Sequence, residues 1–109
     1  MTNQAQSGFD FAARREYLTR LEEDFRRFDE AHPKVWELFV RFTFELIDRG
    51  FKHHSADAVI HRVRWETPAG ADGLAEWKCN NNHVAHYARK FAREYPAHKQ
   101  FFRFRRASA

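Results

Sequence analysis

Apolar side chains recur along the first third of the chain at the spacing of an α-helix. Between Phe9 and about Ala31 they stand three, four or seven residues apart, which places them in one stripe along a helix. The opposite face carries Arg and Glu side chains, as a solvated surface does. Residues 1–8 have no apolar anchor, so we expect a disordered N-terminus there. The members of the stripe are Phe11, Leu18, Leu21, Phe25 and Phe28.

A second helix is predicted from Pro33 to the neighbourhood of Gly50. Proline is favoured at the first position of a helix, and glycine is favoured just after the last one. Most positions between these two residues are apolar, which leaves little polar surface on any side. A helix of this kind is typically the central, buried one of a small domain.

A short third helix is predicted to begin after Ser55, a good N-cap residue. We expect it to stop near Arg64, because Thr67 and Pro68 oppose helix formation. Its apolar stripe consists of Ala56, Val59, Ile60 and Val63.

A turn segment at residues 68–73 contains an Asp-Gly pair and separates two short runs, 64–67 and 74–79. In the second run, apolar and polar residues alternate as in a half-buried strand. We therefore expect the two runs to form a small antiparallel hairpin.

The last third of the chain predicts a fourth helix, from about residue 82 to Tyr95, and a final strand over residues 100–106. The helix has an apolar inner face of Val84, Tyr87, Ala88 and Phe91. In the strand, Phe102 and Phe104 alternate with Phe101, Arg103 and Arg105.

These elements predict an α+β fold that is mostly α-helical: four helices with a small antiparallel hairpin or sheet, broadly a variant of the winged helix. The chain has 109 residues, a length typical of one domain. We expect one α-rich domain over residues 9–106 and a flexible end at 107–109.

The composition narrows the class of protein. No apolar run approaches the roughly 20 residues that cross a bilayer, and the single cysteine, Cys79, fits a reducing cytoplasm. Aromatic residues reach 17% of the chain, and 14 of the 19 basic residues are Arg. Arginine makes forked contacts with phosphate and stacks on flat rings, so this composition suits a surface that meets nucleic acid or protein.

The positive charge is concentrated at one end of the sequence. Residues 76–109 hold eight basic and two acidic side chains, whereas residues 1–50 hold eight basic and ten acidic ones. Such asymmetry indicates contact with a polyanion, although basic ends also serve solubility.

The fourth helix is the first candidate for a nucleic-acid site. Asn and Arg side chains can read base edges, and backbone N–H groups at a helix N-terminus can bind phosphate. The alternative is a capped surface helix whose basic face is only solvated. The candidate residues on this helix are Asn81, Asn82, His83, His86, Arg89, Lys90 and Arg93.

The final strand is the second candidate. Arg103, Arg105 and Arg106 would contact phosphates beside the helix, and Phe101 would stack on bases of single-stranded nucleic acid. The alternative is an edge strand whose Phe side chains are core and whose Arg side chains prevent edge pairing.

A metal site and a catalytic site have weaker support. Cys79, His83 and His86, with His53 or His54, have metal-ligating side chains but lack the two close ligand pairs of structural zinc sites. The sequence has no Gly-x-Ser-x-Gly, phosphate-binding loop or His-Glu-x-x-His motif. We expect no enzymatic activity, no metal and no cofactor.

At 64–66, 80–82, 87–89 and 101–103 the sequence resembles a family of small, functionally unassigned proteins of phages and prophages. The resemblance covers residues from about Phe25 to Arg106 and implies a phage setting in the cytoplasm of a bacterial host. It transfers no catalytic residue.

Two functions follow as hypotheses. The first is a small DNA-binding protein that contacts the phosphate backbone of duplex DNA through the basic helix and the Arg-rich strand. The alternative is a phage-encoded effector that binds and inhibits a host nucleic-acid enzyme or defence complex. A homodimer formed through the first helix is compatible with either, and no membrane partner is expected.

Overall fold

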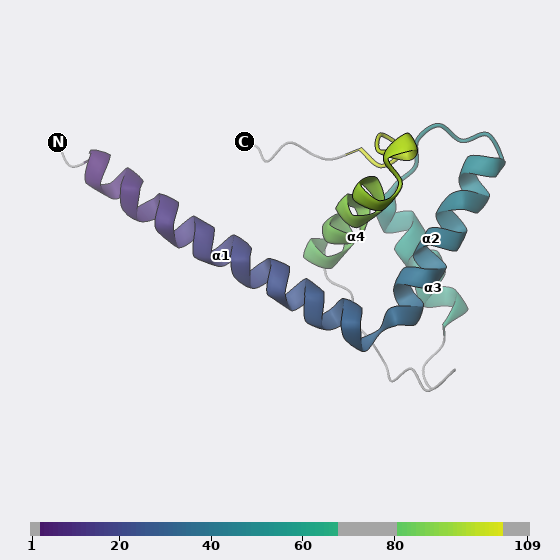
Figure 1. The fold of residues 1–109 in the computed structure, drawn as a ribbon, viewed down its shortest axis with the longest axis horizontal. Coiled ribbons are helices and arrows are strands. Elements are labelled where there is room, and N and C mark those ends of the chain that lie inside the picture. Colours follow the sequence, from purple (N-terminus) through teal and green to yellow (C-terminus); the bar gives the residue numbers. More distant parts are fainter. Residues whose placement is uncertain (1–2, 68–80, 104–109) are drawn as a thin grey trace.

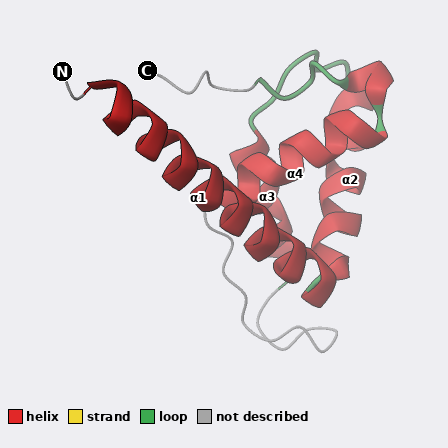
Figure 2. Ribbon diagram, turned by 60° about the vertical axis from the view of Figure 1, so that its left-hand side comes forward, coloured by secondary structure: helices red, strands yellow, loops and turns green. Residues whose placement is uncertain are grey.

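The computed structural model describes residues 3–67 and 81–103, with side chains from residue 11 onward. The described elements are α1 (Asn3–Ala31), α2 (Pro33–Asp48), α3 (Ala56–Glu66), α4 (Asn81–Glu94) and the short 3-10 helix η2 (Pro96–His98). Helices α2, α3 and α4 pack together, and α1 runs past them as a long arm (Figures 1 and 2).

Helix α1 gives the molecule its elongated shape. Its 29 residues rise about 44 Å at 1.5 Å per residue, which accounts for most of the 55 Å longest dimension. The helix begins at Asn3, six residues before the predicted start at Phe9. Only its C-terminal part lies against the other helices, and every residue from 11 to 20 is exposed. The apolar stripe predicted for this helix is therefore buried at Phe25 and exposed at Phe11 and Leu18.

The boundaries of α2 confirm the local signals in the sequence. Pro33 stands in the first turn, where its missing N–H costs nothing, and His32 before it has a non-helical backbone. At the other end Gly50 has a φ of +97°, a conformation that glycine adopts without steric cost. The N–H of Gly50 donates to the Ile47 carbonyl, and that of Phe51 donates to the Leu46 carbonyl, which is a Schellman motif.

Helix α3 starts as predicted but ends later. The Ser55 side chain accepts the N–H of Ala58 at 3.3 Å, so Ser55 is the N-cap. The helix runs through Arg64 to Glu66, and the predicted first strand of the hairpin, 64–67, is wrong. A proline excludes helix only for itself and its immediate neighbour, so Pro68 permits helix up to Glu66. The second predicted strand, 74–79, lies outside the described residues.

The core lies between α2, α3, α4 and the end of α1. Tyr87 of α4 is at its centre, where its ring stacks with Phe39 and Trp36 of α2 and meets Phe25 of α1 edge-on. The predicted inner face of α4 is buried in full, and α2 contacts each of the other three helices, as expected of a central helix. The fully buried apolar side chains are Val35, Phe39, Val63, Tyr87 and Phe91.

Residues 100–103 do not form the predicted strand. Phe101 and Phe102 are neighbours in sequence and are both buried, whereas a strand would alternate them. The His54 N–H donates to the Phe101 carbonyl at 3.2 Å, and the only β-like pairing among the described residues is a single bridge between His54 and Phe102. Because this segment is held by a single bridge and not by a strand ladder, its backbone can turn the rings of both Phe101 and Phe102 towards the core. The rest of that predicted strand, with Phe104, Arg105 and Arg106, lies outside the described residues.

The predicted α+β, winged-helix-like fold class is therefore wrong for the part of the chain that the structure describes, which is all-helical. Among these residues no helix has the length and apolar character needed to span a bilayer.

Candidate nucleic-acid interface on helix α4

Helix α4 carries a polar stripe along its outward side. Asn82, His86, Arg89 and Arg93 are separated by four, three and four residues, so they share one side of the helix. Asn82, Arg89 and Arg93 are exposed, and His86 is half-buried. We call these four residues the α4 stripe. Asn81, also exposed, lies beside it in the first turn.

The two arginines of the α4 stripe form no ion pair with any described residue. By contrast, Arg27 pairs with Glu23 and Asp24 on α1, and Arg62 of α3 pairs with Glu45 of α2 at 3.2 Å. Arg89 and Arg93 lie one helical turn apart, and their charges are available to an external anion.

Lys90 belongs to the fold rather than to the exposed face predicted for it. Its Nζ lies 2.5 Å from Oδ2 of Asp29 on α1 and 4.4 Å from the centre of the Trp36 ring on α2. The side chains of Lys90 and Asp29 are 19% and 18% exposed. The ammonium group therefore ties three helices together, and its charge is already compensated.

His83 is likewise buried, although the sequence pattern placed it on the outer face of the helix. Its ring stacks on Phe28 with centroids 4.7 Å apart and lies near Phe25. Burial lowers the pKa of His83 below its ordinary value of 6.5, and the neighbouring His86 lowers it further, while Asp24 opposes the shift. The neutral imidazole is thus an aromatic core side chain.

His86 lies at the edge between the α4 stripe and the core. Its ring stacks on Phe25 at 5.1 Å and 17°, and its Nδ1 lies 2.7 Å from the Asn82 carbonyl oxygen. Both contacts fix the ring against the helix, which leaves Arg89 and Arg93 as the outward-reaching side chains of the α4 stripe.

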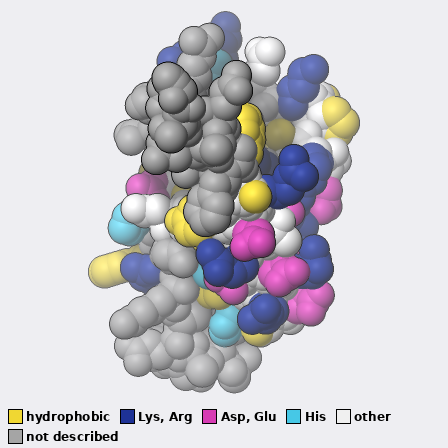
Figure 3. All heavy atoms as spheres, turned by 90° about the vertical axis from the view of Figure 1, so that its left-hand side faces the viewer, with side chains coloured by type: hydrophobic (Ala, Val, Ile, Leu, Met, Phe, Trp, Pro, Cys, Tyr) yellow, Lys and Arg dark blue, Asp and Glu magenta, His cyan; other side chains and the backbone are white. Residues whose placement is uncertain are grey.

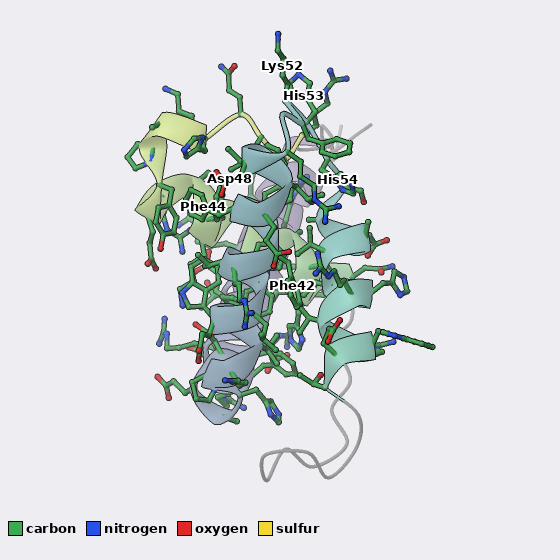
Figure 4. All side chains as sticks on the ribbon, turned by 90° about the vertical axis from the view of Figure 1, so that its right-hand side faces the viewer. Phe42, Phe44, Asp48, Lys52, His53 and His54 are labelled. Atoms are coloured by element: carbon green, nitrogen blue, oxygen red, sulfur yellow. The ribbon has the colours of Figure 1, made fainter. Side chains whose placement is uncertain are left out.

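A second group of basic residues gathers where the loop after α2 meets the segment after η2. His53 Nδ1 lies 3.4 Å from the carbonyl oxygen of Gln100. Gln100 directly precedes Phe101 and Phe102, which His54 contacts. Lys52 and His53 lie at this end of the molecule (Figure 4). Lys99 and Arg103 belong to the segment whose Gln100 and Phe102 contact His53 and His54. All four basic residues are exposed, and we call them the end cluster. Sequence reasoning found Arg103 but missed Lys52 and His53 as site residues, because no local pattern joins residues separated by 47 positions.

Another part of the surface mixes basic and acidic side chains. The face from which α1 projects shows Lys and Arg side chains interleaved with Asp and Glu (Figure 3). Within α1, residues 22–24 are Glu, Glu and Asp. A polyanion is therefore better accommodated by α4 and the end cluster than by this arm.

Among the described residues, no group of three or more His, Cys, Asp or Glu side chains has the arrangement needed to hold a metal ion. Cys79, which the sequence analysis considered as a metal ligand and did not adopt, lies outside the described residues. Arg105 and Arg106 of the predicted nucleic-acid site also lie outside them. The ring of His83 stacks on Phe28, and that of His86 stacks on Phe25.

No known protein family, curated protein or solved structure matches this chain. The resemblance to small phage and prophage proteins stays a prediction from the sequence.

Proposed function

We propose that this protein binds duplex DNA through the α4 stripe, with the end cluster adding contacts to the phosphate backbone. The observation that supports the proposal is the pair Arg89 and Arg93, exposed on one side of a helix and without an ionic partner among the described residues. An exposed guanidinium pair of this kind suits forked hydrogen bonds to phosphate oxygens or to guanine edges.

The dimensions of the α4 stripe agree with this use. Asn82 and Arg93 are separated by about 16 Å along the helix axis at 1.5 Å per residue. The major groove, about 12 Å wide, admits one α-helix, and side chains over three turns reach its floor and both walls. Asn82 is the member of the stripe that can read an adenine edge, and the two arginines reach guanine or phosphate.

The electrostatic balance of this region favours the same ligand. Residues 81–103 contain five basic side chains and one acidic one, Glu94. Lys90 is neutralised by Asp29, so Arg89, Arg93, Lys99 and Arg103 supply the effective charge. Four phosphate contacts predict a salt slope, the change in log K with log salt concentration, of about −3.6 for duplex DNA.

The test is fluorescence anisotropy with a labelled duplex at salt concentrations between about 50 and 200 mM. Arg89→Ala/Arg93→Ala should weaken binding about tenfold and make the slope shallower by about 1.8 units, because two phosphate contacts are lost. Both side chains are exposed, so unfolding by urea should be unchanged within about 0.5 kcal/mol.

The matched control is Arg26→Ala/Arg41→Ala, which removes the same charge from exposed positions on α1 and α2. This control should reduce affinity only slightly. Equal losses in the two double variants would show attraction to net charge alone and would refute the role of α4. A wild-type protein that does not bind duplex DNA at 50 mM salt would refute the function itself.

A further inference from the structure

The N-terminal half of α1 presents an apolar surface that nothing in the described chain covers. Phe11 is 71% exposed, Tyr17 50% and Leu18 47%. Phe11, Leu18 and Phe25 are spaced by seven residues, so the exposed stripe continues directly into the part of α1 that is buried against α4. An isolated helix in water is marginally stable, and this one projects from the bundle without support (Figure 1).

We propose that this half of α1 is an interface with a second copy of the same chain, and that the two α1 helices pair antiparallel. The argument is independent of the proposed function. It rests on the distribution of charge around Leu18 and on the area that the exposed side chains supply.

Charge complementarity selects both the partner and the direction. Arg14 and Arg15 lie one turn before Leu18, and Glu22 lies one turn after it, all three on the side of the helix that Leu18 occupies. In an antiparallel pair that crosses at Leu18, the arginines of one copy lie beside Glu22 of the other, and the same contact occurs twice. A parallel pair would instead place Arg14 and Arg15 of both copies against each other, which is repulsive.

The area that becomes covered indicates a weak to moderate dimer. At the observed exposures, Tyr17 and Leu18 offer about 100 Å² each, so the two copies together cover about 400 Å² through these side chains. Phe11 is not counted, because in this arrangement it lies opposite position 25 of the other copy, which α4 covers. The flanking Arg and Glu stems must supply the remainder of the roughly 1,200 Å² that small specific interfaces bury. We therefore expect dissociation constants on the order of 10 µM.

The test is sedimentation velocity of the full chain, without nucleic acid, from about 1 to 200 µM. The mass should rise from 13.1 kDa towards twice that value. Leu18→Lys should keep the protein monomeric. Arg14→Glu/Arg15→Glu and Glu22→Arg should each weaken association about tenfold, and the triple variant that exchanges both charges should recover it. The control Arg20→Glu lies about 200° around the helix from Leu18 and should leave association unchanged.

Three outcomes would overturn the proposal. A protein that stays monomeric at every concentration has no such interface. A dimer that survives Leu18→Lys uses another surface. Failure of the triple variant to recover association, when both parent variants have lost it, would exclude the antiparallel arrangement. Leu18 is exposed in the monomer, so circular dichroism should show that Leu18→Lys folds normally.

Discussion

Replacing Lys90 by Met removes one ammonium group and tests whether this residue serves the fold. In the structure, Lys90 Nζ lies 2.5 Å from Asp29 Oδ2 and 4.4 Å from the centre of the Trp36 ring. Methionine preserves most of the apolar stem, so the variant isolates the loss of charge. Asp29 is left about one-fifth exposed and without this partner.

The expected loss of stability can be bounded. A hydrogen bond to a charged group contributes about 1.5–3 kcal/mol, and breaking a fully buried ion pair costs about 3–5 kcal/mol. Because water reaches both side chains of this pair, the lower range applies. The contact with Trp36 adds about 0.5–1 kcal/mol. We expect Lys90→Met to reduce the free energy of unfolding by about 2 kcal/mol, which lowers the urea midpoint by about 1 M.

The assay is urea unfolding followed by circular dichroism. The matched control is Arg93→Met, the same removal of a positive charge from an exposed position of α4, with an expected change within about 0.5 kcal/mol. A double-mutant cycle with Asp29→Asn should give a coupling energy of about 1–2 kcal/mol between the two side chains.

Two results would refute this reasoning. Equal stability of Lys90→Met and Arg93→Met would show that the contact with Asp29 contributes nothing. A Lys90→Met variant of unchanged stability that binds DNA as weakly as Arg89→Ala/Arg93→Ala would instead restore Lys90 to the nucleic-acid site predicted from the sequence.

Three further predictions concern stability. The pKa of His83 is lowered in the fold, so protonation favours the unfolded chain and stability is lost as pH falls below 6.5. The difference in unfolding free energy between wild type and His83→Asn should therefore shrink between about pH 7.5 and 5.5. A difference that stays constant over this range would contradict the prediction. Gly50→Ala should reduce the free energy of unfolding in urea by about 1 kcal/mol. The space around the added methyl group is open, so the loss comes from the strain of alanine at a φ of +97°. Unchanged stability would show that the left-handed backbone is not required. Phe39→Ala should reduce the free energy of unfolding by about 3–5 kcal/mol, because Phe39 is fully buried. Phe11→Ala should reduce it by less than about 0.5 kcal/mol at concentrations where the protein is monomeric. Similar thermal melts for the two variants would contradict the assignment of only Phe39 to the core.

The helix boundaries that the sequence predicted correctly are those with a local chemical cause. Pro33 has no N–H to donate, Gly50 tolerates positive φ, and the Ser55 hydroxyl accepts an N–H three residues on. Each effect acts over a few residues and needs no tertiary contact. The end of α3 was misplaced because Thr67 and Pro68 were expected to stop the helix near Arg64, whereas the helix continues to Glu66. Val63 and Thr67 are both buried, and the Thr67 hydroxyl donates to the Val63 carbonyl at 2.7 Å.

The candidate site was predictable in part. Hydrophobic periodicity correctly turned Val84, Tyr87 and Phe91 inward, and so placed Arg89 and Arg93 outward. His83 and Lys90 lie at the borders of that inward face, where periodicity alone does not decide exposure. The position of α1 beside α4 decides it, because Phe28 covers His83 and Asp29 meets Lys90 across 61 residues of sequence.

By itself, then, the sequence determined the elements whose causes are local: the starts of α2 and α3, the end of α2, the inner face of α4 and the excess of positive charge at one end. The tertiary structure alone determined which charges are free, which aromatic rings are covered and which loop meets the C-terminal segment. The physical reason is the distance along the chain over which each kind of interaction acts. Capping and backbone preference act within one turn of helix, whereas burial and ion pairing depend on which residues distant in sequence become neighbours.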